Sequence, residues 1–165
     1  MEALAKKVGE RLKTARAKLV TAESCTGGWA AQVVTSVAGS SAWFERGFVT
    51  YSNEAKRELL GVREKTLEAH GAVSEETARE MAQGALSRGK GSVALAVTGV
   101  AGPGGGSPGK PVGMVCFAWA SAGSVRSETQ QFSGDRESVR RQSVVHALEG
   151  VLQHLEGVPP QPDGG

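Results

Sequence analysis

The chain of 165 residues is long enough for one ordinary domain that buries a core without disulfide bonds or a structural metal. Hydrophobic residues make up 39% and charged residues 22%, a globular composition, and a net charge of +2 is too small to indicate binding to nucleic acid. Two cysteines and no long apolar run argue against a disulfide framework, a paired-cysteine zinc site and a membrane span. With a charged N-terminus in place of a signal peptide, we expect a cytoplasmic protein with reduced thiols.

In the first half of the chain, helical and strand patterns alternate. Leu4, Val8 and Leu12 fall at helical spacing, and short β-rich runs predict strands. Ser52 stands where an N-cap is expected, and Gly61 stands where a helix should end. In chain order we predict a helix from Leu4 to Ala15, a strand over Leu19–Glu23, a helix from Trp29 that ends at Gly39, a strand in the later half of 43–51, a helix from Ser52 to Leu60 and a short helix around Glu64–His70.

The second half contains the strand that we expect at the centre of the sheet. Ser92–Thr98 is short, apolar and bounded by glycines, as is typical of a strand covered on both faces. Ser74 and Asp135 are the predicted N-caps of two long helices. We predict a helix from Ser74 that fades at 89–91, a glycine-rich loop over Gly99–Pro111, a hairpin of Val112–Ala120 with Ser124–Phe132, a helix from Asp135 and, after a domain of residues 1–156, a disordered tail over 157–165.

Helices interleaved with strands, together with one hairpin, predict an α/β fold in which a mixed sheet carries helices on both faces. Ligands of such sheets bind at the ends of strands. Three polar stretches follow predicted strands, namely Ser24–Gly28, Tyr51–Lys56 and Thr98–Gly106. This coincidence is the main argument from the residues themselves for a functional site.

The stretch Thr21–Gly28 leads from a strand end into a helix start. Such a junction gathers backbone N–H groups and the positive end of the helix dipole beside Ser24, Cys25 and Thr26, as a nucleophile facing an oxyanion or a phosphate requires. The two glycines that end the stretch lack a Cβ and allow close approach of a ligand. A thiolate is stabilised at such a place, so Cys25 is a second candidate nucleophile, ranked below Ser24. The alternative is an ordinary turn with Ser24 or Thr26 as N-cap.

A serine nucleophile needs a base, and the chain offers few. His70, His146 and His154 lie away from the strand ends, which argues against a Ser-His-Asp triad. Lys56 lies one turn beyond a strand end and could serve as the base if burial lowers its pKa; otherwise it is an exposed helix lysine. Thr98 could donate to an oxyanion or relay a proton, or it is simply the last β-branched residue of its strand.

The last predicted helix begins with two cations in an unfavourable place. Arg136 and Arg140 lie one turn apart in the first turns, where the helix dipole repels positive charge. A bound phosphate would reverse this penalty, because arginine side chains and helix N–H groups both bind anions. The alternative is local pairing, for which Glu137 and Arg141 stand four residues apart.

These motifs together resemble the CinA C-terminal domain family, the nicotinamide-nucleotide amidohydrolases or NMN deamidases. The resemblance extends from about Leu4 to Leu155, and separated motifs in the right order are more specific than one glycine-rich loop. The matching stretches are Ala22–Gly28, Gly39–Phe44, Gly47–Asn53, Lys56, Gly71–Ser74, Thr98–Pro103, Lys110–Gly113 and Gly134–Arg136.

The resemblance implies a three-layer α/β/α sandwich and hydrolysis of the carboxamide of nicotinamide mononucleotide to nicotinate mononucleotide and ammonia, without metal or organic cofactor. It implies Ser24 as nucleophile and Lys56 as general base, with Tyr51 and Thr98 as polar helpers. Backbone N–H groups near the nucleophile would hold the oxyanion, and the glycine-rich loop with the arginines would hold the phosphate. The implied substrate-binding residues are Thr26, Gly27, Gly28, Gly102, Gly104, Arg136 and Arg140.

A different class of function stays open at this stage. The family's domain often follows a nucleotide-pyrophosphatase-like module, which this sequence lacks, so the resemblance implies the stand-alone deamidase form. The alternative is a non-catalytic nucleotide- or partner-binding module linked to competence or DNA damage, which would need the glycines and arginines but not Lys56. We expect a small-molecule substrate and no membrane partner, and with so few aromatic residues a second subunit could help to wall the site.

Overall fold

The computed structural model describes residues 1–157, so the tail predicted over 157–165 lies outside the described residues except for Gly157. Helices and strands alternate along the chain as predicted, and Ser52, Ser74 and Asp135 each cap a helix through the side chain. The elements are α1 (Glu2–Thr14), β1 (Leu19–Glu23), α2 (Trp29–Thr35), the 3₁₀ turn η1 (Ser40–Ala42), β2 (Phe44–Val49), α3 (Asn53–Leu60), α4 (Glu64–His70), α5 (Glu75–Arg88), β3 (Val93–Gly99), β4 (Met114–Ser121), β5 (Ser124–Gln131) and α6 (Arg136–Glu156).

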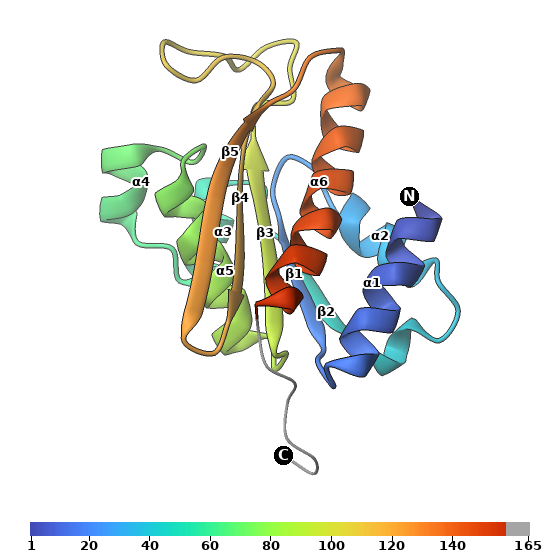
Figure 1. Cartoon of the computed structure of the whole chain (residues 1–165). Coiled ribbons are helices and arrows are strands. Elements are labelled where there is room, and N and C mark those ends of the chain that lie inside the picture. The colour runs from blue at the N-terminus through green and yellow to red at the C-terminus, as the bar shows by residue number, and fades with distance from the viewer. Residues whose placement is uncertain (158–165) are drawn as a thin grey trace.

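The five strands form one mixed sheet in the order β2-β1-β3-β4-β5 (Figure 1). β1 pairs in parallel with β2 and with β3, whereas β4 and β5 form the predicted antiparallel hairpin. Ala22 of β1 lies opposite Phe48 of β2 and Ala96 of β3, so the carboxyl ends of the three parallel strands meet at one edge. The segments after these strands are the three polar stretches, which the fold therefore brings to one edge of the sheet.

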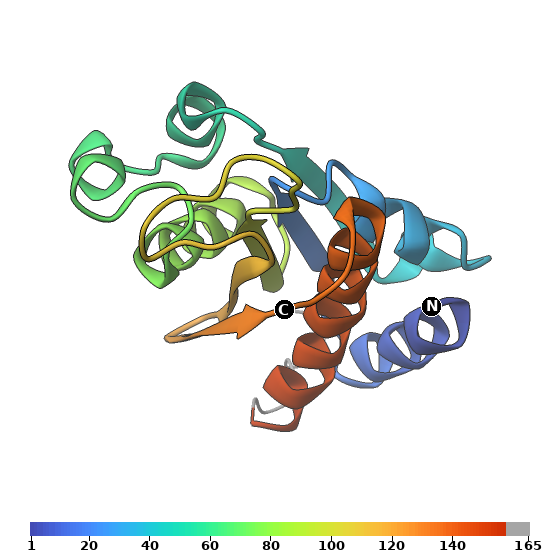
Figure 2. The ribbon, with the colours of Figure 1, turned by 90° about the horizontal axis from the view of Figure 1, so that it is seen from above.

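Helices cover both faces of the sheet and give the predicted α/β layers (Figure 2). α1, α2 and α6 pack on one face against the large side chains of β3 and β4, among them Leu95, Phe117 and Trp119. α5 and the end of α3 pack on the other face, where the strands present small residues such as Ala94 and Ala118. The small side chains let these helices lie close to the sheet, which places α3 beside the shared edge.

The helix after β1 is shorter than predicted. It ends at Thr35, and Gly39, the predicted end point, instead adopts a φ of +84° before η1. The hydroxyl of Thr35 donates to Ala31 O at 2.8 Å and that of Ser36 donates to Val33 O at 2.6 Å. Hydroxyls bonded to the last turn favour a helix end, and the chain must reverse here to begin β2.

Candidate active site

The edge of the sheet fixes the position of Ser24. Ser24 N–H donates to Val97 O at 3.0 Å, and Thr50 N–H donates to Glu23 O at 2.8 Å. These two bonds continue the parallel pairing one step beyond the end of β1. Ser24 therefore leaves the sheet beside Thr98 and Thr50, which are far from it in sequence, and its Oγ donates to Tyr51 O at 3.4 Å.

Lys56 meets Ser24 in the interior. Ser52 accepts a hydrogen bond from Ala55 N–H and so starts α3 in the orientation that turns Lys56 inward. Lys56 is 1% exposed, and its Nζ lies 2.9 Å from Ser24 Oγ. The same Nζ donates to Thr50 O at 2.9 Å and to Tyr51 O at 3.1 Å. The alternative of an exposed helix lysine is therefore wrong.

The environment of Lys56 shifts its titration towards the neutral form. Burial lowers the pKa of Lys56 from its ordinary value of 10.5 to about 8, because the charged form loses its hydration. In the described part of the chain no carboxylate pairs with Lys56, so two backbone carbonyls and a hydroxyl are its only hydrogen-bond partners. A lysine with this pKa can accept the proton of Ser24 near neutral pH.

The nucleophile turn, Ser24–Gly28, offers some free amides. Gly27 and Gly28 have φ of +59° and +102°, which explains the two residues without Cβ. Gly27 N–H donates to Ser24 O at 3.0 Å, so this member of the expected oxyanion amides is already bonded. Within the described residues, the N–H groups of Thr26 and Gly28 have no hydrogen-bond partner.

The side chain that accepts from the first amides of α2 belongs to a residue that the sequence analysis missed. Glu23, the last residue of β1, is fully buried and accepts from Ala30 N–H at 2.8 Å and from Ala31 N–H at 3.1 Å. The hydroxyl of Thr26 donates to the same carboxylate at 2.6 Å. The alternative in which Ser24 or Thr26 caps the helix is thus wrong. An acidic residue just before a helix start was the available signal.

Cys25 does not have the environment of a nucleophile. It is 6% exposed, and burial, with the nearby charge of Glu23, raises the pKa of its thiol to about 12. The thiol form is unreactive near neutral pH. Of the two adjacent candidates, only Ser24 has a base beside it.

The hydroxyls of Thr98 and Tyr51 both point to partners other than Ser24. Thr98 is buried and donates to Ala72 O at 2.9 Å, which ties the segment before α5 to the sheet. Tyr51 is 64% exposed, and its hydroxyl accepts from Arg136 at 3.4 Å. The backbone carbonyl of Tyr51 is the group that contacts Ser24 and Lys56.

The two arginines of α6 have separate roles. Arg136 is exposed and donates to Gly102 O at 2.8 Å, so it joins the glycine-rich loop to the hydroxyl of Tyr51. Arg140 donates to Cys25 O and to Thr26 O, both at 3.1 Å, and so holds the nucleophile turn. Glu137 and Arg141 also form the exposed pair that was the alternative to a phosphate.

The glycine-rich loop is fixed at its base and open at its tip. Gly113 N–H donates to Val100 O at 2.7 Å, and Gly102 is buried with a φ of +87°. Gly104 is exposed, and a Cβ placed on it would meet no atom within 4 Å. The loop therefore leaves room for a ligand around Gly104 and the guanidinium of Arg136.

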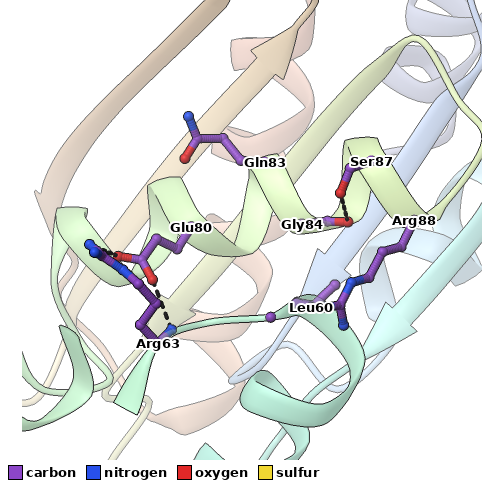
Figure 3. A pocket seen from close by; sticks show the side chains of 8 residues that line it. Leu60, Arg63, Glu80, Gln83, Gly84, Ser87 and Arg88 are labelled. Atoms are coloured by element: carbon purple, nitrogen blue, oxygen red, sulfur yellow. Dashed lines mark hydrogen bonds and ion pairs between the residues drawn. The ribbon is translucent and has the colours of Figure 1, made fainter. Parts of the chain in front are cut away.

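A large surface hollow lies elsewhere on the molecule, between the end of α3 and α5 (Figure 3). It measures about 540 Å³ and contains the ion pair of Arg63 with Glu80, 3.1 Å apart. Neither Ser24 nor Lys56 lines it.

The sequence model of the CinA C-terminal domain matches residues 1–155. The chain belongs to this family. Over 153 residues it is 56% identical to the nicotinamide-nucleotide amidohydrolase PncC of Escherichia coli strain K12, which covers 92% of this chain and 93% of that protein. It is 54% identical to the PncC of Pseudomonas putida, over 91% of this chain and 94% of that protein.

A solved structure agrees with the family assignment. The competence/damage inducible protein CihA from Agrobacterium tumefaciens superposes with a TM-score of 0.90 at 46% identity, covering 94% of each chain. Within residues 1–157, none of the helices is long and apolar enough to cross a membrane, and no group of three or more His, Cys, Asp or Glu side chains could hold a metal ion.

Proposed function

We propose that this protein hydrolyses the carboxamide of nicotinamide mononucleotide, giving nicotinate mononucleotide and ammonia through a Ser24–Lys56 mechanism. The observation that carries the proposal is the 2.9 Å contact of Lys56 Nζ with Ser24 Oγ inside the protein. The relatives named nicotinamide-nucleotide amidohydrolase support the substrate class. The choice of nicotinamide mononucleotide as the substrate comes from the family resemblance of the sequence motifs.

In the first half of the reaction, neutral Lys56 takes the proton of Ser24 as Oγ attacks the carboxamide carbon. The tetrahedral intermediate then collapses, and the protonated lysine returns the proton to the leaving nitrogen, which departs as ammonia. In the second half, Lys56 takes a proton from water as the water oxygen attacks the ester carbon. The second tetrahedral intermediate then expels Ser24 Oγ, the protonated lysine returns the proton to Oγ, and nicotinate mononucleotide is released. Each half begins and ends with neutral Lys56, so the pKa of about 8 suits both steps.

The oxyanion of both intermediates would lie at the nucleophile turn. The amides of Thr26 and Gly28 are the candidates, because that of Gly27 is already bonded to Ser24 O. The C=O of Cys25 and the N–H of Thr26 belong to one trans peptide and point in opposite directions. By binding Cys25 O, Arg140 therefore fixes the direction of the Thr26 amide. One preorganised donor of this kind accelerates acyl transfer by about 10²- to 10³-fold.

The assay that tests the proposal is ammonia release from nicotinamide mononucleotide by the wild type, Ser24→Ala, Lys56→Ala and Lys65→Ala. Ser24→Ala and Lys56→Ala should each lose about a thousandfold or more in kcat, because the nucleophile and base act as a unit. Lys65 lies exposed on α4, and its variant should keep wild-type activity. Circular dichroism of each variant shows whether it is folded. A folded wild type that binds the nucleotide and releases no ammonia would instead support the binding-module alternative.

We also propose that Arg136, with Gly102 and Gly104 of the loop, receives the phosphate, whereas Arg140 acts on the nucleophile turn. Arg136→Ala should raise KM for the nucleotide about 10- to 100-fold, since a charge-assisted hydrogen bond contributes roughly 1.5–3 kcal/mol. Its KM for the nucleoside without phosphate should stay unchanged. Arg140→Ala should lower kcat instead. The assignment is wrong if the two variants exchange these effects.

The setting of the enzyme is part of the proposal. Cys25 and Cys116 are buried and unpaired, which suits the reducing cytoplasm in which we place the protein. A homo-oligomer in which a second subunit helps to enclose the site stays a prediction from the small number of aromatic residues in the sequence.

A further inference from the structure

The carboxylate of Glu23 is buried without a cation. It is 0% exposed, and in the described part of the chain it has no ion pair with lysine, arginine or histidine. A buried carboxylate without a partner is costly. Its three hydrogen bonds, from Thr26 Oγ1 and from the amides of Ala30 and Ala31, offset this cost. A carboxylate in this position is a specific feature of the turn rather than a solvated surface charge.

The bonds of Glu23 connect the two elements that carry the nucleophile turn. Its backbone is held in the sheet, because its carbonyl accepts from Thr50 N–H. Its side chain is held by α2, because Ala30 and Ala31 are the second and third residues of that helix. The turn Ser24–Gly28 lies between these two fixed ends. Glu23 therefore sets the distance and direction between strand end and helix start.

Within residues 1–157, no side chain other than that of Glu23 accepts from the first amides of the helix. Its N-cap residue is Gly28, which has a φ of +102° and no side chain to accept from the first amides. The hydroxyl of Thr26 is turned to Glu23, and that of Ser24 remains available to Lys56. If Ser24 capped the helix, as such residues commonly do, its oxygen would be engaged with backbone amides.

We infer that Glu23 is a positioning residue, which holds the nucleophile turn so that Ser24 Oγ faces Lys56 and the amides of Thr26 and Gly28 face the reacting carbonyl. Glu23 makes no hydrogen bond to Ser24 Oγ or Lys56 Nζ, so it acts through the turn. This inference rests on the proposed function only in taking Ser24 as the nucleophile; the nucleotide substrate is not needed for it.

The chain offers a matched control in Glu80. This carboxylate accepts from Arg63 N–H at 2.9 Å and from the hydroxyl of Thr66 at the start of α4, remote from Ser24. Glu23→Gln and Glu80→Gln thus make the same chemical change at two carboxylates that bind a helix start and a threonine, and the two differ in that Glu80 also pairs with the guanidinium of Arg63 at 3.1 Å. In each variant an amide NH₂ replaces one acceptor oxygen and faces a donor.

The experiment makes two kinetic measurements on wild type, Glu23→Gln and Glu80→Gln. The first is kcat and KM for ammonia release from nicotinamide mononucleotide, and the second is the rate at which a fluorophosphonate labels Ser24, followed by mass spectrometry. Glu23→Gln should lower kcat and the labelling rate at least tenfold with KM changed less than about twofold, since small displacements of a nucleophile cost about 10²-fold. Glu80→Gln should lower Tm and leave both rates unchanged. Should Glu23→Gln fail to fold, Thr26→Val, which removes one of the three bonds, should lower both rates several-fold.

The possible results separate the inference from the proposed function. Wild-type labelling and kcat in folded Glu23→Gln, or equal losses in Glu80→Gln, would overturn the role of Glu23. If Ser24 is labelled in a manner that depends on Glu23 while no ammonia is released, the positioning role holds and the proposed substrate is wrong. If the wild type neither reacts with the probe nor releases ammonia, Ser24 is no nucleophile and both ideas fail.

Discussion

At the scale of single residues, the chemistry depends on where charge is removed from water. Lys56 is buried with neutral acceptors around it, and Cys25 is buried without a hydrogen bond from its thiol to a base among the described residues. The same physical effect, loss of hydration, lowers the pKa of the amine and raises that of the thiol. Burial therefore makes Lys56 a better base for Ser24 and keeps the neighbouring Cys25 in its unreactive thiol form.

This assignment predicts the pH dependence of the reaction. Because neutral Lys56 is the active form, kcat/KM should rise with pH through about 8 and level off above it. At two pH units below the midpoint, activity should be about a hundredth of the plateau. Cys25→Ser should leave the profile unchanged, since its thiol titrates near 12. A pH–rate profile that stays flat from pH 6 to 9 would contradict Lys56 as the base.

At the scale of elements, the site depends on close packing of α3 against α5. A Cβ placed on Gly84 of α5 would lie 1.8 Å from Leu60 O, at the end of α3 (Figure 3). Helix α3 also carries Lys56, with its N-terminus capped by Ser52. The approach of the two helices therefore sets how deeply the lysine reaches the edge of the sheet.

Gly84→Ala should accordingly destabilise the protein although alanine is the better helix former. Backbone must move to accept the methyl group, and overpacking of this kind costs about 1–3 kcal/mol. Urea denaturation measures the loss. Gln83→Ala, an exposed change on the same helix, is the control and should stay within about 0.5 kcal/mol of the wild type. A Gly84→Ala variant as stable as the control would show that the two helices can separate freely.

At the scale of the whole molecule, burying Lys56 lowers the free energy of unfolding at the pH values where its amine is charged. The pKa of Lys56 is lower in the folded protein than in the unfolded chain, so the unfolded chain binds more protons between pH 8 and 10.5. As pH rises through that window, the contribution of this lysine makes the free energy of unfolding larger. Below pH 8 the full penalty is present, because the folded protein must hold a charged amine.

This linkage can be measured against Lys56→Met. Between pH 7 and pH 10 the free energy of unfolding of the wild type, relative to that of the variant, should increase by about 2 to 3 kcal/mol. Both proteins share the other titrating groups, which cancel in the comparison. Equal changes in the two proteins would mean that Lys56 is not desolvated.

Much of the architecture followed from local patterns. β1 and α4 have the bounds that were predicted, and Ser74 and Asp135 cap their helices, because strand runs and caps depend on neighbouring residues. The prediction failed at the end of α2, where the reversal of the chain overrides the helical pattern.

The sequence by itself determined the candidate nucleophile and the one lysine placed beyond a strand end. Only the tertiary structure decided that Lys56 is buried against Ser24, that the Glu23 carboxylate rather than a hydroxyl accepts from the first amides of α2, and that Arg136 and Arg140 bind different segments. Lys56 and Ser24 are 32 residues apart, and Arg140 and Cys25 are 115 apart. Desolvation and hydrogen bonding at such separations depend on which elements pack together, and no local pattern contains that information.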